Sequence, residues 1–283
     1  MEFNGFIFPA PSLDYHMIKI YRNELIYIPS NDPKESYYIP CLFLKNQKSE
    51  NFKNFVIFFH GNAEDIFLSR SMAYGLLEKL DMNIIVVEYP GYSVYKGDPD
   101  ADKILKNTWI VYDFVKKTFK LEDKNIFVFG RSIGTGPAVY LSSVRRPNAL
   151  LLVSSFTSIR AVAGNLVGPL KYLLKDRFFS IEYMKNVKCP VFFIHGKSDP
   201  LIPYKETELL RKNCKTDNDI LLPPHMTHND FDLYEDIIGP IDEFIKNKCT
   251  VDYEKIEYNK SEYEKLYKTP EEVHAYIQTL LNK

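Results

Sequence analysis

The sequence predicts a single doubly wound α/β domain, in which a mostly parallel sheet is flanked by helices. Short apolar runs alternate with segments of helical periodicity along most of the 283 residues. Several of these runs are apolar at every position, as expected for parallel strands, which are buried on both faces. One of them, residues 126–129, leads directly into a glycine-containing turn and a helix. Strand, turn and helix therefore repeat in the order that a parallel sheet requires.

The first two predicted strands form an antiparallel edge of this sheet. They are residues 17–28 and 37–44, separated by a segment rich in Asn, Asp, Pro and Ser that fits a turn. Residues 55–59 follow as a central parallel strand. Further along the chain, we expect a helix over 65–80 and a strand over 83–88.

The second half continues the alternation. A helix with one apolar stripe is expected from residue 101 to 119, and the strand 126–129 enters the glycine-containing turn. Later strands are predicted at 149–153, 189–194 and 219–222, and later helices at 203–212 and 233–246. Residues 154–187 have little strand character and are interpreted as a cap-like excursion over the site.

The domain is expected to span residues 1–249, and residues 250–283 are predicted to be a C-terminal helical extension. In the extension, Thr269, Pro270 and Glu272 have the order of a capped helix start. An apolar stripe follows, which we expect to dock on the domain rather than on a partner.

Composition and charge are those of a folded protein without a nucleic-acid partner. Hydrophobic residues make up 45% and charged residues 26%, and 36 basic against 37 acidic residues give a net charge of −1. Such a balance creates no overall field for nucleic acid or an acidic membrane. We expect a neutral or small-molecule substrate and a monomer.

The cysteine pattern predicts a reducing compartment without a metal or other cofactor. The four cysteines lie far apart, with no C-x-x-C pair and no metal-ligand spacing. The first 15 residues lack the features of a signal peptide, and no apolar run approaches the roughly 18 residues that span a bilayer. We therefore expect a cytoplasmic protein, with peripheral membrane contact through the apolar N-terminal residues as the alternative to a packed arm.

The turn after strand 126–129 has the pattern G-x-S-x-G and predicts Ser132 as a nucleophile. Gly130 and Gly134 suit a sharp strand-to-helix turn, where a Cβ at either position would meet the crowded backbone. This turn exposes the serine at its tip. A serine hydroxyl reacts at neutral pH only with an imidazole to take its proton and a carboxylate to orient that imidazole.

Asp199 and His228 are the predicted carboxylate and imidazole. Each follows a predicted parallel strand, so both lie at the same edge of the sheet as Ser132, and the order Ser, Asp, His is the one this chemistry uses on such sheets. Asp176 and Asp230 are the alternative carboxylates. His225 and His228 also form a His-x-x-His pair, but no third metal ligand is apparent.

The oxyanion formed when Ser132 attacks a carbonyl needs preorganised donors. The backbone N–H of Ile133, at a helix start, and that of Asn62, in the loop after strand 55–59, are the candidates. His60 is interpreted as a buried residue that fixes this loop.

These motifs resemble the α/β-hydrolases of the bud-emergence (BEM) group and their relatives, which include protein depalmitoylases. The matching segments are residues 60–63, 130–135, 195–199 and 228–230, and the similarity extends over roughly residues 13–244. The resemblance implies an α/β-hydrolase fold with Ser132, Asp199 and His228 as triad and the Asn62 region as oxyanion loop.

The sequence thus predicts a serine hydrolase that cleaves acyl esters or thioesters through an acyl-enzyme, with protein depalmitoylation among its reactions. A lipid esterase or lysophospholipase is the alternative within enzymes. A catalytically silent binding module is the alternative from another class, and it is disfavoured because all three triad residues are present.

Overall fold

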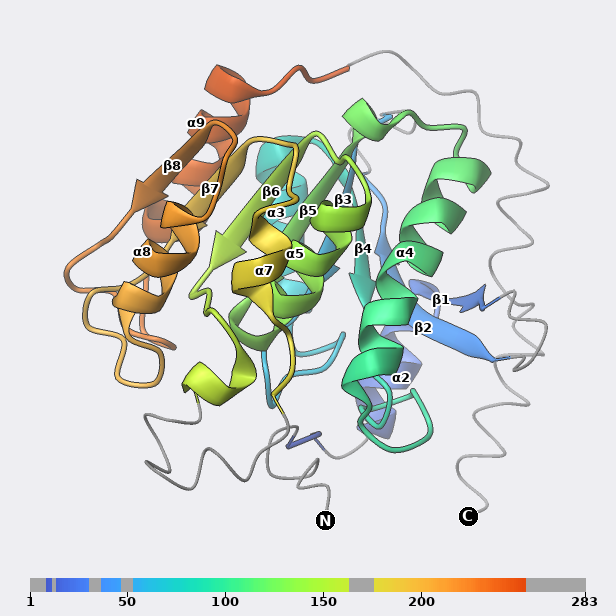
Figure 1. Cartoon of the computed structure of the whole chain (residues 1–283). Coiled ribbons are helices and arrows are strands. Elements are labelled where there is room, and N and C mark those ends of the chain that lie inside the picture. Colours follow the sequence, from blue (N-terminus) through green and yellow to red (C-terminus); the bar gives the residue numbers. More distant parts are fainter. Residues whose placement is uncertain (1–8, 12–13, 31–36, 47–52, 163–175, 253–283) are drawn as a thin grey trace.

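An eight-stranded sheet forms the centre of the protein (Figure 1). The structure is a computed structural model that describes residues 9–11, 14–30, 37–46, 53–162 and 176–252. The strands are β1 (Leu25–Pro29), β2 (Tyr38–Leu44), β3 (Phe55–Phe59), β4 (Asn83–Val87), β5 (Ile126–Arg131), β6 (Ala149–Val153), β7 (Val191–Ile194) and β8 (Asn218–Leu221). Their spatial order is β1-β2-β4-β3-β5-β6-β7-β8.

Strands β3 to β8 run parallel, and β1 and β2 add an antiparallel edge. The predicted α/β class with a mostly parallel sheet is therefore confirmed.

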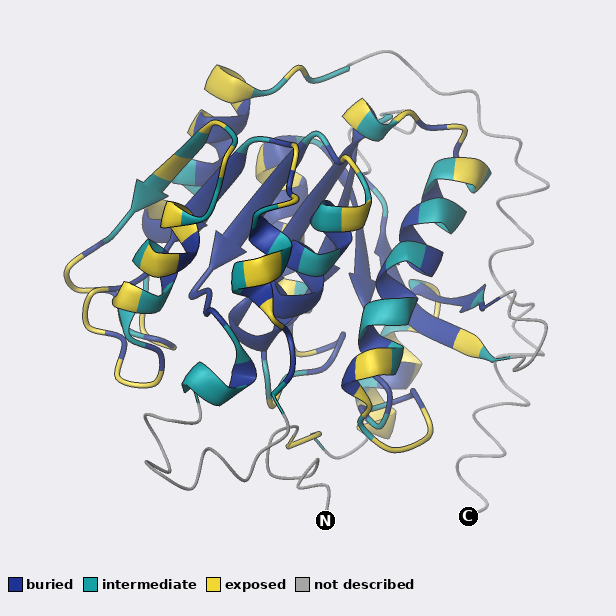
Figure 2. Cartoon of the chain, in the orientation of Figure 1, coloured by how far each residue is buried: buried dark blue, intermediate teal, exposed yellow. Residues whose placement is uncertain are grey.

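Helices cover both faces of the sheet. Helices α4 (Ala101–Thr118), α5 (Thr135–Val144), α7 (Ser180–Met184) and α8 (Tyr204–Lys212) pack on one face. Helices α2 (Tyr15–Tyr21), α3 (Arg70–Leu80) and α9 (Gly239–Lys248) pack on the other. Strand residues alternate between these two clusters, so each central strand contributes to both and is buried throughout (Figure 2).

One predicted strand is wrong over half its length. Residues 17–28 were expected to be extended, but the structure has helix α2 first and strand β1 only from Leu25. The Asp14 carboxylate accepts hydrogen bonds from the N–H groups of His16 and Met17 and so caps the helix. Met17, Ile18 and Tyr21 recur at helical spacing and pack in one apolar cluster.

Other element boundaries differ by less. Helix α3 begins at Arg70 rather than at the expected residue 65. The residues from Asp65 onward form turns, in which the Asp65 carboxylate accepts hydrogen bonds from two backbone N–H groups. The expected helix 233–246 consists of a π-helical turn, η4 (Leu233–Ile238), followed by α9. Of the excursion 154–187, residues 163–175 lie outside the described residues, as do residues 253–283 of the predicted C-terminal extension. In the part of the chain that is described, no helix is both long and apolar enough to cross a membrane.

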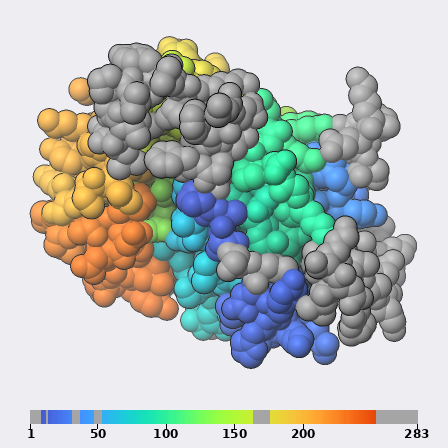
Figure 3. Space-filling model, turned by 90° about the horizontal axis from the view of Figure 1, so that it is seen from below, coloured from blue at the N-terminus to red at the C-terminus, as the bar shows by residue number. Residues whose placement is uncertain are grey.

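Parallel pairing brings the carboxyl ends of β3, β5, β7 and β8 to one rim of the sheet. Phe59 is opposite Gly130, and Ile194 is opposite both Val153 and Leu221. Figure 3 looks onto this rim, where cyan segments from the first third of the chain lie beside orange segments from the last. The loops that follow these strands therefore meet there.

Candidate active site

Ser132 lies in a tight turn between β5 and α5. Its φ of 52° is in the left-handed region, which costs a non-glycine residue about 1–3 kcal/mol and persists only where the surroundings impose it. A Cβ on Gly130 would lie 2.5 Å from the Gly134 carbonyl oxygen, and one on Gly134 would lie 2.2 Å from the Phe59 carbonyl oxygen. The two glycines therefore permit the close packing of strand, turn and neighbouring strand that sequence reasoning expected.

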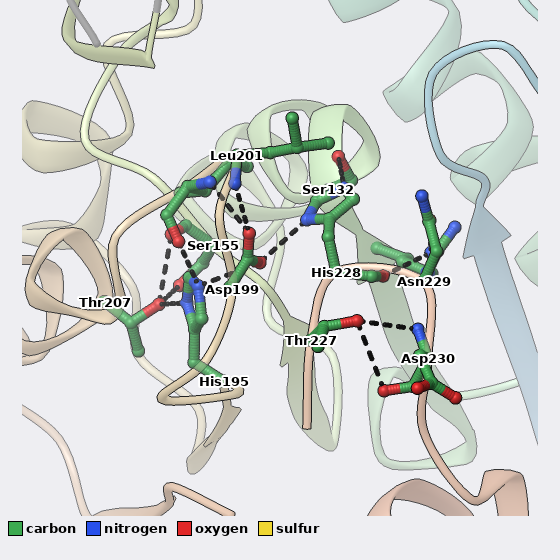
Figure 4. Close-up of polar contacts among 12 residues, drawn as sticks. Ser132, Ser155, His195, Asp199, Leu201, Thr207, Thr227, His228, Asn229 and Asp230 are labelled. Atoms are coloured by element: carbon green, nitrogen blue, oxygen red, sulfur yellow. Dashed lines mark hydrogen bonds and ion pairs between the residues drawn. The ribbon is translucent and has the colours of Figure 1, made fainter. Parts of the chain in front are cut away.

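His228 joins Ser132 to Asp199 in one hydrogen-bonded chain (Figure 4). Its Nε2 is 3.0 Å from Ser132 Oγ, and its Nδ1 is 2.7 Å from Asp199 Oδ2. A carboxylate only accepts, so Nδ1 carries a proton and Nε2 of the neutral ring is free to accept from the serine hydroxyl. All three residues are buried, with exposed fractions of 7%, 8% and 9% for Ser132, His228 and Asp199.

Asp199 is held as an anion by several donors. Its Oδ1 accepts from the N–H groups of Leu201 and Ile202, at 2.8 and 2.9 Å, and its Oδ2 lies 3.3 Å from His195 Nε2. Burial alone raises the pKa of this carboxyl, but hydrogen bonds from His195, His228 and the Ile202 N–H outweigh burial and lower the pKa well below its usual range. The Asp199 carboxylate therefore stays charged and can accept the hydrogen bond from His228 Nδ1.

A second buried imidazole lies behind this carboxylate. His195 Nε2 donates to the Ile202 carbonyl at 2.8 Å as well as approaching Asp199. Its Nδ1 is 2.6 Å from Thr207 Oγ1, which in turn donates to the Ser155 carbonyl at 3.0 Å. The loop that carries Asp199 is thus tied to α8 and to the end of β6.

The two predicted oxyanion donors come from adjacent strands. Asn62 lies in the loop after β3. Ile133 is the second residue of η2 (Ser132–Gly134), whose last residue, Gly134, packs directly against the end of β3. The Tyr92 hydroxyl donates to Asn62 Oδ1 at 2.7 Å, and the Tyr89 hydroxyl donates to the His60 carbonyl at the same distance. The residues after β4 therefore hold the Asn62 loop against the turn.

A buried ion pair fixes the start of that loop. His60 and Glu88 are both fully buried, and His60 Nε2 is 3.0 Å from Glu88 Oε1. The other ring nitrogen, Nδ1, is 2.9 Å from the Gly61 carbonyl, which only accepts. Burial lowers the pKa of His60, but the hydrogen bond to Glu88 and the charge of that carboxylate, with smaller contributions from the Gly61 carbonyl and the Glu64 charge, together raise the pKa by more, so the net shift is upward. This arrangement fits the interpretation of His60 as the residue that fixes the loop.

The alternative carboxylates, Asp176 and Asp230, and the second histidine, His225, bond to residues other than Ser132. The ring of His225 is mostly exposed and pairs with Asp236. Asp176 accepts from the Ser158 hydroxyl and the Arg160 N–H, and the backbone N–H of Asp230 donates to the Thr227 hydroxyl. Within the described residues, no group of three or more His, Cys, Asp or Glu side chains could hold a metal ion.

Sequence reasoning missed several polar residues around the site, notably Arg131, Glu64 and Glu88. Arg131 and Glu88 stand at the ends of fully buried strands and are themselves buried. A charged residue at the end of an apolar run was the available signal, because a buried charge needs a partner. The identity of each partner was not readable from the pattern.

Comparisons of the whole sequence agree with this architecture. The chain is 30% identical over 207 residues to the α/β-hydrolase domain-containing protein aho-3 of Caenorhabditis elegans, an alignment that covers 73% of this chain and 61% of aho-3. It is 28% identical over 210 residues to the human α/β-hydrolase domain-containing protein 17B, covering 74% of this chain and 72% of that protein. The chain has the α/β-hydrolase fold. No family model matches it.

Solved structures of proteins with low sequence identity share the fold. The Pyrococcus furiosus esterase Pf2001 superposes with a TM-score of 0.66 at 16% identity, over 85% of this chain and 97% of the esterase. Est1E from Butyrivibrio proteoclasticus gives a TM-score of 0.59 at 17% identity, over 79% of this chain and 96% of Est1E. These likenesses show a shared fold.

Proposed function

We propose that the protein is a serine hydrolase that cleaves acyl esters or thioesters. The observation that carries the proposal is the hydrogen-bonded chain from Asp199 through His228 to Ser132, with contacts of 2.7 and 3.0 Å at a buried rim. This is the constellation that converts a hydroxyl into a nucleophile. Asp199 stays ionised because its pKa is lowered, so it stabilises the imidazolium that forms on His228.

The proposed reaction has two halves. Ser132 Oγ attacks the carbonyl carbon while His228 Nε2 takes the hydroxyl proton, and the N–H groups of Asn62 and Ile133 stabilise the oxyanion. His228 then returns the proton to the departing alkoxide or thiolate, which leaves an acyl group on Ser132. Water, deprotonated by His228, attacks this ester and releases the carboxylic acid and the free serine.

An exposed apolar side chain beside the site supports an acyl substrate. Leu201 is 40% exposed, and its N–H is bound to Asp199. In Figure 4 its side chain extends toward Ser132. The resemblance to protein depalmitoylases adds long-chain acyl thioesters, and hence acylated proteins, to the substrates that fit.

The test is turnover of a chain-length series, from acetyl to palmitoyl, in matched ester and thioester forms, with a palmitoylated peptide and a lysolipid included. We expect hydrolysis of at least one ester or thioester series by the unaltered protein and none above background by Ser132→Ala. A preference for the lysolipid would favour the lipid-esterase alternative. Folded protein that hydrolyses no member would contradict the proposal.

A further inference from the structure

Arg131 lies between the two loops that flank Ser132. It is the residue between Gly130 and Ser132 and is only 5% exposed. Its Nη1 contacts the Glu64 carboxylate in the loop after β3. Its Nη2 donates to the His228 carbonyl at 2.8 Å and to Asn229 Oδ1 at 2.9 Å, both in the loop after β8. One guanidinium therefore connects the loop of the proposed oxyanion donor with the loop of the proposed base.

Glu64 extends this connection to the backbone. Its Oε2 accepts from the Gly61 N–H at 3.2 Å, one residue before Asn62. A Cβ at position 61 would lie 2.9 Å from Arg131 Nη1 and 3.3 Å from Glu64 Oε1, so the glycine leaves the space that the pair occupies. Glu64 also places a negative charge against the N–H of the residue before Asn62. The guanidinium offsets that charge.

Stability is a weak explanation for this pair. Arg131 is buried, and the desolvation penalty of a buried charge can exceed the gain from its partner. In addition, Arg131 Nε is buried without a hydrogen-bond partner among the described residues. An unsatisfied buried donor typically costs about 1–3 kcal/mol.

We propose that Arg131 and Glu64 form a clamp that sets the position of the Asn62 loop relative to His228 and neutralises the carboxylate that binds this loop. Both are positioning residues, since they act through the backbone of the two loops. The inference rests on the proposed hydrolase function for its kinetic consequences, whereas the positional consequence for His228 is independent of turnover.

The kinetic test is a double-mutant cycle of Arg131→Met and Glu64→Gln. Arg131→Met removes the bridge and leaves Glu64 uncompensated, and we expect kcat to fall roughly 100-fold with little change in KM, as for a displacement of about 1 Å in a catalytic group. Adding Glu64→Gln to this variant is expected to restore kcat about tenfold, because the unpaired charge is removed. Equal kcat values for Arg131→Met and the double variant would overturn the neutralising role.

Arg131→Lys separates the bridge from the charge, because a single ammonium does not reproduce the planar fork that reaches both loops. We expect its kcat to lie between those of the unaltered protein and Arg131→Met, and a kcat equal to the unaltered value would overturn the bridging role. Arg145→Met is the matched control. It removes a guanidinium that pairs with Asp113 through contacts of 2.8 and 2.6 Å, at the end of α5 remote from Ser132. Urea unfolding of each variant verifies that it is folded.

A spectroscopic readout keeps this inference separate from the proposed function. The His228 Nδ1 proton, held by Asp199, should give an isolated downfield proton NMR signal in the unaltered protein. We expect it to shift or broaden in Arg131→Met and Arg131→Lys and to stay unchanged in Arg145→Met. An unchanged signal in both Arg131 variants would overturn the clamp even in an active hydrolase. Absence of any hydrolysis together with the expected NMR changes would overturn the function and leave the clamp supported.

Discussion

Gly134→Ala tests the packing of the serine turn against the end of β3. The added Cβ would lie 2.2 Å from the Phe59 carbonyl oxygen and 2.5 Å from that of His60. Real Cβ atoms essentially never approach within 3.0 Å, so the two backbones must separate by at least 0.8 Å, the difference between 3.0 and 2.2 Å. Both obstacles are backbone atoms, so no side-chain rotation relieves the contact.

This separation would displace Ser132 and Ile133 from the Asn62 loop. Displacement by about 1 Å in a catalytic arrangement costs roughly 100-fold in rate. We therefore expect kcat/KM for a short acyl ester to fall by about that factor. Overpacking should also lower the free energy of unfolding by about 1–3 kcal/mol.

The assay pairs steady-state hydrolysis with urea unfolding of the same preparations. Gly97→Ala is the control, because Gly97 has a φ of +119° and no atom within 4 Å of its added Cβ. It should lose stability through backbone strain while kcat/KM remains unchanged. If Gly134→Ala retained kcat/KM within about twofold of the unaltered protein, the displacement reasoning based on a 1 Å shift would be refuted.

Two further predictions concern charge. Asp199→Asn should lower kcat about 10⁴-fold, because an amide no longer fixes the Nδ1-protonated tautomer of His228. Steady-state kinetics on the folded variant measures this loss of kcat. A loss below about tenfold would contradict the assigned role of Asp199. The pKa of His60 is raised in the folded state, so its pairing with Glu88 contributes full stability below the unfolded pKa of about 6.5 and loses that contribution as the pH rises through the folded value. Urea unfolding at a series of pH values should therefore show the free energy of unfolding falling over this interval in the unaltered protein relative to His60→Gln, and parallel curves would exclude the assigned charge.

Strands and their carboxyl rim were readable from the sequence because each depends on a local pattern. Residues 55–59 are apolar at every position and form β3 with the expected bounds. The segment 17–28 failed because its first residues satisfy helical spacing as well as strand alternation, and the Asp14 cap decides between them.

The positions of Ser132, Asp199 and His228 followed from one rule, that parallel strands end at the same rim. The partners of Arg131 did not follow, since Glu64 is 67 positions away and His228 is 97 positions away. Likewise, His195 contacts Thr207, which reaches back 52 positions to Ser155. Such contacts depend on how loops from separate strands pack, and the hydrophobic periodicity of the sequence does not predict this packing.

Mass-spectrometric mapping of the site modified by a fluorophosphonate is the most direct test of the activated serine. We expect a single adduct on Ser132, much slower formation of that adduct in His228→Ala, and no adduct on Ser132→Ala. A folded protein that remains unmodified at Ser132, or one labelled equally fast after His228→Ala, would contradict the assignment of His228 as the base that activates this hydroxyl.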